Sequence, residues 1–162
     1  MSRRTWLACA LMAFVALSAA CRAEPDATKA LAVTDIVTGW LDKGIVDGQN
    51  KLVPTISLKV RNGADRPLSY LQLNAVFRIV DDTEELGSKV VWATEGSELA
   101  PGGSLGPFNL SSELGYASLA PRLQMLQHRE FKDAKVELFV KQGSRQWAKL
   151  GEYPITRQLL AR

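Results

Sequence analysis

Short segments in which hydrophobic and polar residues alternate follow one another along most of the chain after residue 30. The most regular reads Thr-Ile-Ser-Leu-Lys-Val-Arg over residues 55–61, so Ile56, Leu58 and Val60 share one face. A period of two places alternate side chains on opposite faces and predicts β-strands with one buried face. Further strands are expected at residues 31–41, 69–80, 89–94, 135–141 and 147–152, with a short one near Phe108.

The segments between these strands are rich in turn-forming residues. Residues 44–51 (GIVDGQNK) are expected to form a loop, Pro101-Gly102-Gly103 a sharp turn, and residues 142–145 the turn of a hairpin. Seven short strands at this spacing predict an all-β fold: an immunoglobulin-like antiparallel β-sandwich over residues 30–162. One interruption, residues 120–130 with Pro121 near its start, is expected to form a short helical crossover.

The N-terminus has the pattern of an export signal. Arg3 and Arg4 precede a 12-residue apolar run at residues 6–17, and small residues follow at 18–20. Twelve residues rise only about 18 Å as a helix, against the ~30 Å of a bilayer core. A cleaved signal peptide over residues 1–23 is therefore expected, and the mature protein would be exported.

Two cleavage sites are compatible with this signal. Cys21 after two alanines is similar to a bacterial lipoprotein signal, although Ser18 stands where that motif normally has leucine. The alternative is ordinary cleavage after Ala23, which gives a soluble periplasmic or secreted protein. If Cys21 is lipidated, the protein is anchored in the periplasm or at the outer membrane. A polar linker over residues 22–29 then holds the domain within about 30 Å of the lipid.

The excess of basic residues in the full chain is confined to the predicted signal and its border. The chain has 20 basic and 17 acidic residues, but three arginines belong to or adjoin the signal, which leaves 17 of each from residue 24 onward. General affinity for nucleic acid is therefore not expected. The charges are unevenly placed: residues 24–121 carry 8 basic and 13 acidic residues, and residues 122–162 carry 9 and 4. The basic C-terminal section is a candidate contact for anionic lipid or an acidic partner.

Groups that could support catalysis are few. His128 is the single histidine, and Ser111-Ser112 lacks the glycine-flanked turn of a serine nucleophile. The acidic run at residues 81–85 lacks the alternating ligand pattern of a calcium loop. We therefore expect no enzyme activity, no cofactor and no metal site. The large aromatic residues Trp40, Trp92, Trp147 and Tyr153 are expected to lie in the core.

Residues 77–81 (Phe-Arg-Ile-Val-Asp) are a degenerate form of Phe-x-Leu-Tyr-Asp, in which Phe77 and Asp81 match. With Val60-Arg61-Asn62-Gly63 upstream and the turn at residues 99–103 downstream, the region of about residues 55–110 resembles the FxLYD family of exported domains. The resemblance implies an immunoglobulin-like sandwich and carries no active site. Val80, in the tyrosine position, is expected to pack against the domain.

Together these patterns predict a non-enzymatic bacterial cell-envelope protein that acts as a structural or protein-interaction module. Its partners would be an unidentified envelope protein and, through a lipid on Cys21, a membrane. Lys135, Phe139 and Lys141 alternate outward along one strand and form the candidate interaction surface. The alternative is a periplasmic carrier that binds a small ligand between the sheets.

Overall fold

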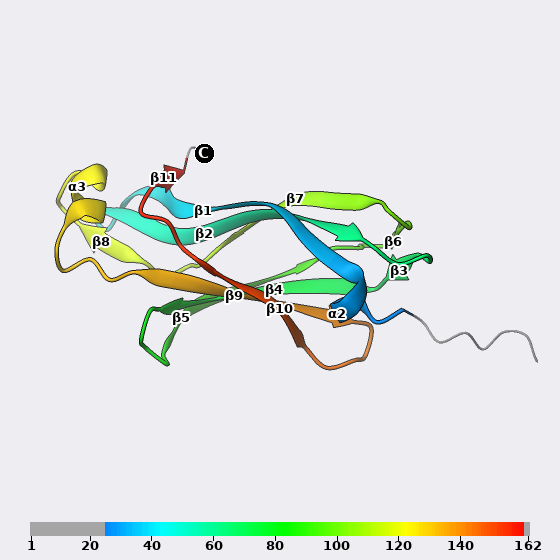
Figure 1. The fold of residues 1–162 in the computed structure, drawn as a ribbon. Helices are drawn as coiled ribbons and strands as arrows, with labels where there is room; N and C mark the ends of the chain where they lie inside the picture. Colours follow the sequence, from blue (N-terminus) through cyan, green and yellow to red (C-terminus); the bar gives the residue numbers. More distant parts are fainter. Residues whose placement is uncertain (1–24, 161–162) are drawn as a thin grey trace, which may run out of the picture.

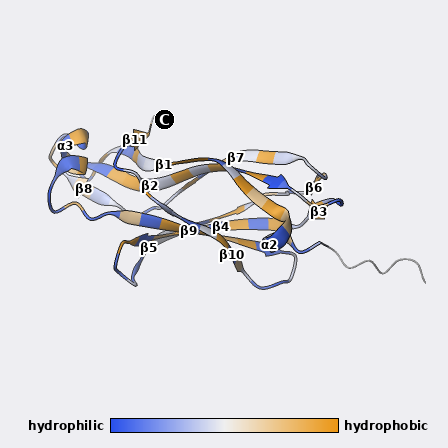
Figure 2. Ribbon diagram, viewed as in Figure 1, coloured by the Kyte–Doolittle hydropathy of each residue, from blue (hydrophilic) through white to orange (hydrophobic). Residues whose placement is uncertain are grey.

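Seven strands of seven residues or more form two sheets that face each other (Figure 1). The structure is a computed structural model and describes residues 25–160. The predicted signal peptide, both cleavage sites and Cys21 lie outside the described residues. Hydrophobic and hydrophilic residues follow one another along strands such as β4 and β9 (Figure 2), which is the pattern expected of strands with one buried face.

The first sheet has the order β1-β2-β7, with β1 spanning Leu31–Val46, β2 Gln49–Asn62 and β7 Ser104–Ser111. Two short strands extend it. Strand β8 (Tyr116–Ser118) pairs with the start of β2, and β11 (Leu159–Leu160) lies parallel to β1. Every other strand pair of the described residues is antiparallel.

The second sheet has the order β10-β9-β4-β5. Its strands are β10 (Ala148–Pro154), β9 (Ala134–Gln142), β4 (Leu71–Ile79) and β5 (Glu85–Trp92), and a separate pair joins β3 (Leu68–Ser69) to β6 (Glu98–Leu99). If only the seven long strands are numbered in chain order, the first sheet has the strand order 1-2-5 and the second has the order 7-6-3-4. This is the immunoglobulin arrangement with the fourth strand on the second sheet. The expected all-β sandwich is confirmed.

The core lies between the two sheets and is made mainly of leucines, valines and aromatic rings. One end of the core holds an aromatic cluster, in which the centre of the Trp40 ring lies 4.7 Å from that of Phe131 and 5.5 Å from that of Tyr116. The largest fully buried side chains are Trp40, Phe77, Leu52, Ile56, Leu58, Leu68, Leu71, Leu73, Leu110 and Leu138. Because most come from the alternating segments, the period of two identified the core face correctly.

The loop expected at residues 44–51 is instead a tight hairpin. Strand β1 continues to Val46, β2 begins at Gln49, and Asp47-Gly48 alone makes the turn. Both turn residues have positive φ, 52° and 78°, as a two-residue hairpin of the primed type requires. The Asp-Gly pair was the local signal for this turn.

The end of the expected linker belongs to the domain. Residues 27–29 fall within a single helical turn, α2 (Ala27–Ala30), which begins where the Asp26 carboxylate accepts a hydrogen bond from the Thr28 backbone N–H at 3.0 Å. Ala27 is buried. The sequence predicted a linker here because one capping aspartate in a short polar segment is a weak signal for a helix.

The helical crossover is confirmed as α3 (Arg122–Gln127), with Pro121 immediately before its first residue. Met125 and Leu126 are buried, whereas Leu123 is exposed. Val80, which was expected to pack, is also exposed. It lies just beyond the last residue of β4, Ile79.

The exposed edges of both sheets are irregular. Pro107 interrupts β7 at a bulge, where the pairing with β2 shifts between Leu58 and Val60. On β5, Lys89 pairs with the buried Ala75 and therefore belongs to the inner face of the sheet, yet it is exposed at the open edge.

Candidate interaction surfaces

The outer face of β9 carries the three residues predicted as an interaction surface. Lys135, Phe139 and Lys141 all point away from the core, because Val136, Leu138 and Val140 occupy the buried positions. Lys135 and Lys141 are six residues apart, which is about 20 Å along a strand. The structure therefore assigns them to two different regions of one face, with the half-buried Phe139 between them.

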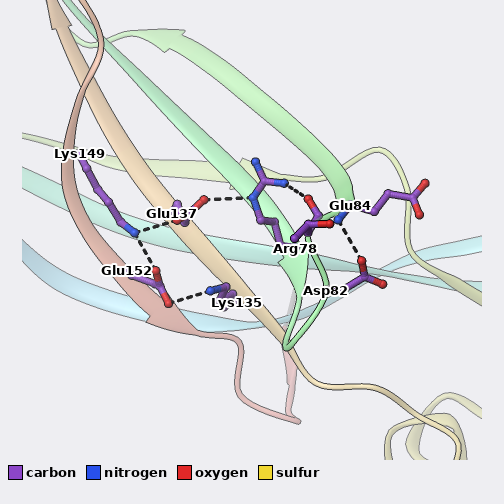
Figure 3. Close-up of polar contacts among 8 residues, drawn as sticks. Arg78, Asp82, Glu84, Lys135, Glu137, Lys149 and Glu152 are labelled. Atoms are coloured by element: carbon purple, nitrogen blue, oxygen red, sulfur yellow. Dashed lines mark hydrogen bonds and ion pairs between the residues drawn. The ribbon is translucent and has the colours of Figure 1, made fainter.

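Lys135 belongs to a ladder of ion pairs across β4, β9 and β10 (Figure 3). The Arg78 Nε lies 3.1 Å from Glu137 Oε2, and Lys149 Nζ lies 2.7 Å from both Glu137 Oε1 and Glu152 Oε2. Lys135 Nζ completes the ladder at 3.1 Å from Glu152 Oε1. Each charge in this ladder already has a partner of opposite sign.

The ladder shifts the titration of its members. The hydrogen bond from Lys149 is the main cause that lowers the pKa of Glu137, assisted by Arg78 and opposed by partial burial. Bonds from Lys149 and then Lys135 lower the pKa of Glu152, and the bond to Glu137 is the first cause that raises the pKa of Lys149. All three groups are therefore held in their charged forms, which stabilises the sheet locally rather than offering free charges to a partner.

The other end of this face carries three exposed aromatic residues, which we call the aromatic end: Tyr70, Trp92 and Trp147, exposed by 69%, 52% and 38%. Gln72 pairs with Trp92 on one side and with Lys141 on the other. The Lys141 Nζ lies 5.9 Å from the centre of the Trp147 ring, a cation–π distance. The expectation that Trp92 and Trp147 lie in the core is wrong, whereas Trp40 is fully buried and Tyr153 packs against the core.

The opposite end of the sandwich exposes aliphatic side chains. Ile45 and Val46 lie at the β1–β2 turn, and Leu119 and Leu123 lie before and within α3; we call these four residues the apolar end. Asn50 joins the two segments, because it pairs with Ile45 and with Ser118 and its side chain donates to the Ala120 carbonyl at 2.9 Å. The exposed fractions of Ile45 and Leu119 are 72% and 79%.

A hollow of about 350 Å³ lies between β8 and the α3 segment. Tyr116, Met125, His128 and Phe131 are among its lining residues. Burial raises the pKa of the Tyr116 phenol, whose oxygen accepts a hydrogen bond from the Lys132 backbone N–H at 3.2 Å. The His128 Nδ1 accepts from the Glu130 backbone N–H at 3.2 Å, so this ring nitrogen closes a turn.

A second, wider hollow of about 590 Å³ lies on the outer face of the first sheet. Its floor is polar: Thr55, Ser57, Asn109 and Ser111 line it, and the Thr55 hydroxyl donates to the Ser111 hydroxyl at 2.9 Å. Leu160 of β11 forms part of its apolar wall. The first hollow borders the core, since Met125 and Phe131 of its lining are buried there, whereas the second lies outside it.

Ser112 and Asp82, from the serine pair and the acidic run of the sequence analysis, form hydrogen bonds with nearby backbone groups. The Ser112 hydroxyl donates to the Leu86 carbonyl at 3.3 Å and accepts from the Leu114 N–H, and the Asp82 carboxylate accepts from the Glu84 N–H at 3.0 Å. Among residues 25–160, no three histidine, cysteine or acidic side chains gather as metal ligands would. No helix in this part of the chain has the length and apolar character needed to cross a bilayer.

Comparisons with known proteins give no family. No protein-family model and no curated protein matches the chain. Among solved structures, it is similar to the structural-genomics target SoR45 (TM-score 0.44, 10% identity, covering 80% of this chain and 89% of that one). It is also similar to the putative ApaA protein from Bordetella pertussis (TM-score 0.43, 12% identity, covering 78% and 93%). Likenesses of this degree carry no argument about what the chain binds or does.

Proposed function

We propose that this chain is a non-enzymatic, exported cell-envelope protein, anchored by a lipid on Cys21, that binds another envelope protein. The charged and apolar leader followed by Cys21 supports export and anchoring. The observation that carries the binding role is the apolar end, where Ile45 and Leu119 are more than two-thirds exposed on neighbouring segments. Exposed clusters of this kind on soluble domains commonly mark protein contacts.

The position and charge of the apolar end favour a particular occupant. The apolar end and α2 lie at opposite ends of the sandwich (Figure 1), separated by the 16 residues of β1, or about 50 Å. A domain anchored through its N-terminus would present the apolar end away from its own membrane. The nearby Arg122 is paired with Asp42, whereas Asp47 of the turn and Lys43 are exposed, so the matching surface on the partner would be an apolar patch with polar groups at its rim.

A second copy of this chain fits less well. A two-fold contact through the apolar end would point the two N-termini in opposite directions. Two copies anchored in one membrane could not make that contact. The proposed occupant is therefore a different protein with an apolar contact surface.

Photo-crosslinking in intact cells of the native host tests this proposal. A photoreactive residue at Leu119 or Leu123 is expected to give one discrete crosslinked product, and one at Lys59 on the outer face of β2 is not. The double variant Ile45→Ser/Leu119→Ser, with the photoreactive residue at 123, is expected to lose the product while keeping its unfolding midpoint, since both side chains are mostly exposed. The same products from position 59, or no product from 119 and 123, would overturn the proposed contact.

The anchor has a separate test. The mass of the mature N-terminal peptide is expected to show a lipid on Cys21, and Cys21→Ala is expected to release the protein from membranes. An unmodified N-terminus at Glu24 would contradict the lipid anchor and leave export intact.

A ligand carrier is a second candidate, favoured by the 350 Å³ hollow beside Tyr116, Met125 and Phe131. Apolar and aromatic walls with a few polar groups are typical of small-molecule sites. A thermal-shift screen with fatty acids, sugars and metal ions tests it. A ligand that raises the midpoint of the wild type, and raises that of Met125→Gln less, would support this candidate. If no midpoint moves, the candidate is rejected.

A further inference from the structure

The aromatic end lies beside the point where the chain enters the domain. The Ala27 backbone N–H donates to Gln142 Oε1 at 3.2 Å, which fixes α2 against the end of β9. Gln142 directly follows Lys141, and the next residue, Gly143, donates its N–H to the Tyr70 carbonyl at 2.9 Å. The N-terminal segment and the aromatic end therefore share one end of the molecule.

The distance to the proposed lipid is short. Six residue steps separate Cys21 from Ala27, which is about 20 Å when fully extended. Because residues 27–29 belong to α2 and not to a linker, the reach is shorter than the sequence alone indicated. A lipid on Cys21 would thus hold the Gln142 region close to the bilayer surface.

The residues at this end have the chemistry of a membrane interface. Tryptophan and tyrosine rings are enriched at the headgroup level, where one side of the ring is apolar and the other polar. Lys141 and Arg145 form no ion pair within residues 25–160, in contrast to Lys135 and Lys149 of the ladder. Glu95, three residues after Trp92, offsets part of the positive charge of Lys141 and Arg145. We therefore expect burial of the aromatic rings to contribute most of the free energy of membrane binding.

We infer that Tyr70, Trp92 and Trp147, with Lys141 beside them, form a second contact with the bilayer that holds the lipid on Cys21. This inference rests on the proposed lipid anchor and adds an orientation of the domain relative to the membrane. A single point of attachment leaves the domain free to rotate. Insertion of the rings at the headgroup level would fix the second sheet's aromatic end against the membrane and direct the apolar end outward.

Tryptophan quenching by lipids with brominated acyl chains tests the contact. The chain has four tryptophans, and removal of the signal peptide with Trp6 leaves Trp40, Trp92 and Trp147. The lipid-modified protein from the native host, reconstituted in phosphatidylethanolamine–phosphatidylglycerol vesicles containing brominated lipid, is expected to lose tryptophan emission. The double variant Trp92→Phe/Trp147→Phe retains only the buried Trp40 and is expected to lose none.

The outcomes separate the two proposals. If the N-terminal peptide carries the lipid and the wild type is quenched no more than the double variant, the membrane contact is wrong and the anchor stands. If the peptide carries no lipid, the anchor is wrong and this inference fails with it. If the rings are unquenched but a photoreactive residue at Trp147 gives a discrete protein crosslink, the aromatic end binds a protein and the inference is also overturned. The unfolding midpoint of the double variant checks that it is folded.

Discussion

Ala27 and Gln142 are 115 positions apart in the chain, yet the backbone N–H of the first donates to the side-chain oxygen of the second. The bond is buried and joins the start of the domain to the end of β9. Helix α2 is thus held by a side chain of the second sheet.

Replacing this acceptor should loosen α2. Gln142→Met keeps the length of the side chain but removes the acceptor of the buried Ala27 N–H and of the Arg145 guanidinium, so we expect a loss of about 1–2 kcal/mol in the free energy of unfolding. Urea unfolding measures the loss, and amide exchange at residues 27–31 should become faster. Gln146→Met, at an exposed position of the β9–β10 turn, is the control and should leave both unchanged. Equal midpoints for the two variants would contradict the role of the bond.

Gly115 is fixed by close packing. A Cβ atom built on it would lie 2.0 Å from the Leu52 carbonyl oxygen and 2.9 Å from the Val53 Cα, both backbone atoms that cannot move aside. Gly115→Ala should therefore reduce stability by about 2–4 kcal/mol in thermal or urea unfolding. Gly96→Asn is the matched control, because nothing lies within 4 Å of its Cβ position and asparagine tolerates the positive φ. A small effect of Gly115→Ala would show that the start of β8 can shift.

The ion-pair ladder should make stability depend on pH in the acid range. Because the pKa of Glu137 is lowered in the folded state, its contribution is fully present above its unfolded pKa of about 4.3. That contribution is lost as the pH falls through the lower, folded pKa. Glu137→Gln should thus be less stable than the wild type by about 1 kcal/mol at pH 7, with the difference shrinking below about pH 4.

Urea unfolding at several pH values from 7 to 3 measures this difference. The exposed Glu95→Gln is the control, since Glu95 forms no ion pair within residues 25–160. A gap between wild type and Glu137→Gln that stays constant with pH would contradict the ladder's electrostatic role.

Thr38 holds the C-terminal segment onto β1. Its hydroxyl donates to the Pro154 carbonyl at 2.8 Å and accepts from the Thr156 N–H at 3.2 Å. Thr38→Val keeps the shape and removes both bonds, so we expect a loss of about 1–2 kcal/mol and faster amide exchange at Trp40, whose N–H donates to Gln158. Thr34→Val on the same strand is the control. No difference between the variants would show that the Thr38 hydroxyl adds nothing to the backbone pairing of this segment with β1.

The sequence predicted those parts of the fold that depend on the period of two. Buried and less buried residues alternate strictly along β9 and, as far as Ala75, along β4, because one face of each strand fills the core. The period does not say which of a strand's two faces is buried: in β5 the inner positions are Lys89 and Val91, which pair with Ala75 and Leu73. Trp92, at the last position of β5, shares a face with the exposed Val90 and lies outside the core despite its residue type.

The candidate surfaces were harder to predict for a related reason. Arg78, Glu137 and Lys149 come from three strands, and their ladder depends on a register that no local pattern gives. The apolar end likewise joins a hairpin turn to the start of α3. Lys135, Phe139 and Lys141 were correctly placed on one outer face, but their division between the ladder and the aromatic end required the neighbouring strands.

The irregular sheet edges have a consequence for the behaviour of many copies together. An exposed, regular edge strand is a template on which another chain can add a strand, and such addition leads to aggregation. Pro107 has no N–H to offer along β7, and Lys89 brings a charge to the inner face of β5, where a new strand would have to cover it. At these two edges, copies of the domain held at high local concentration, as on a surface, would therefore not add strands to one another.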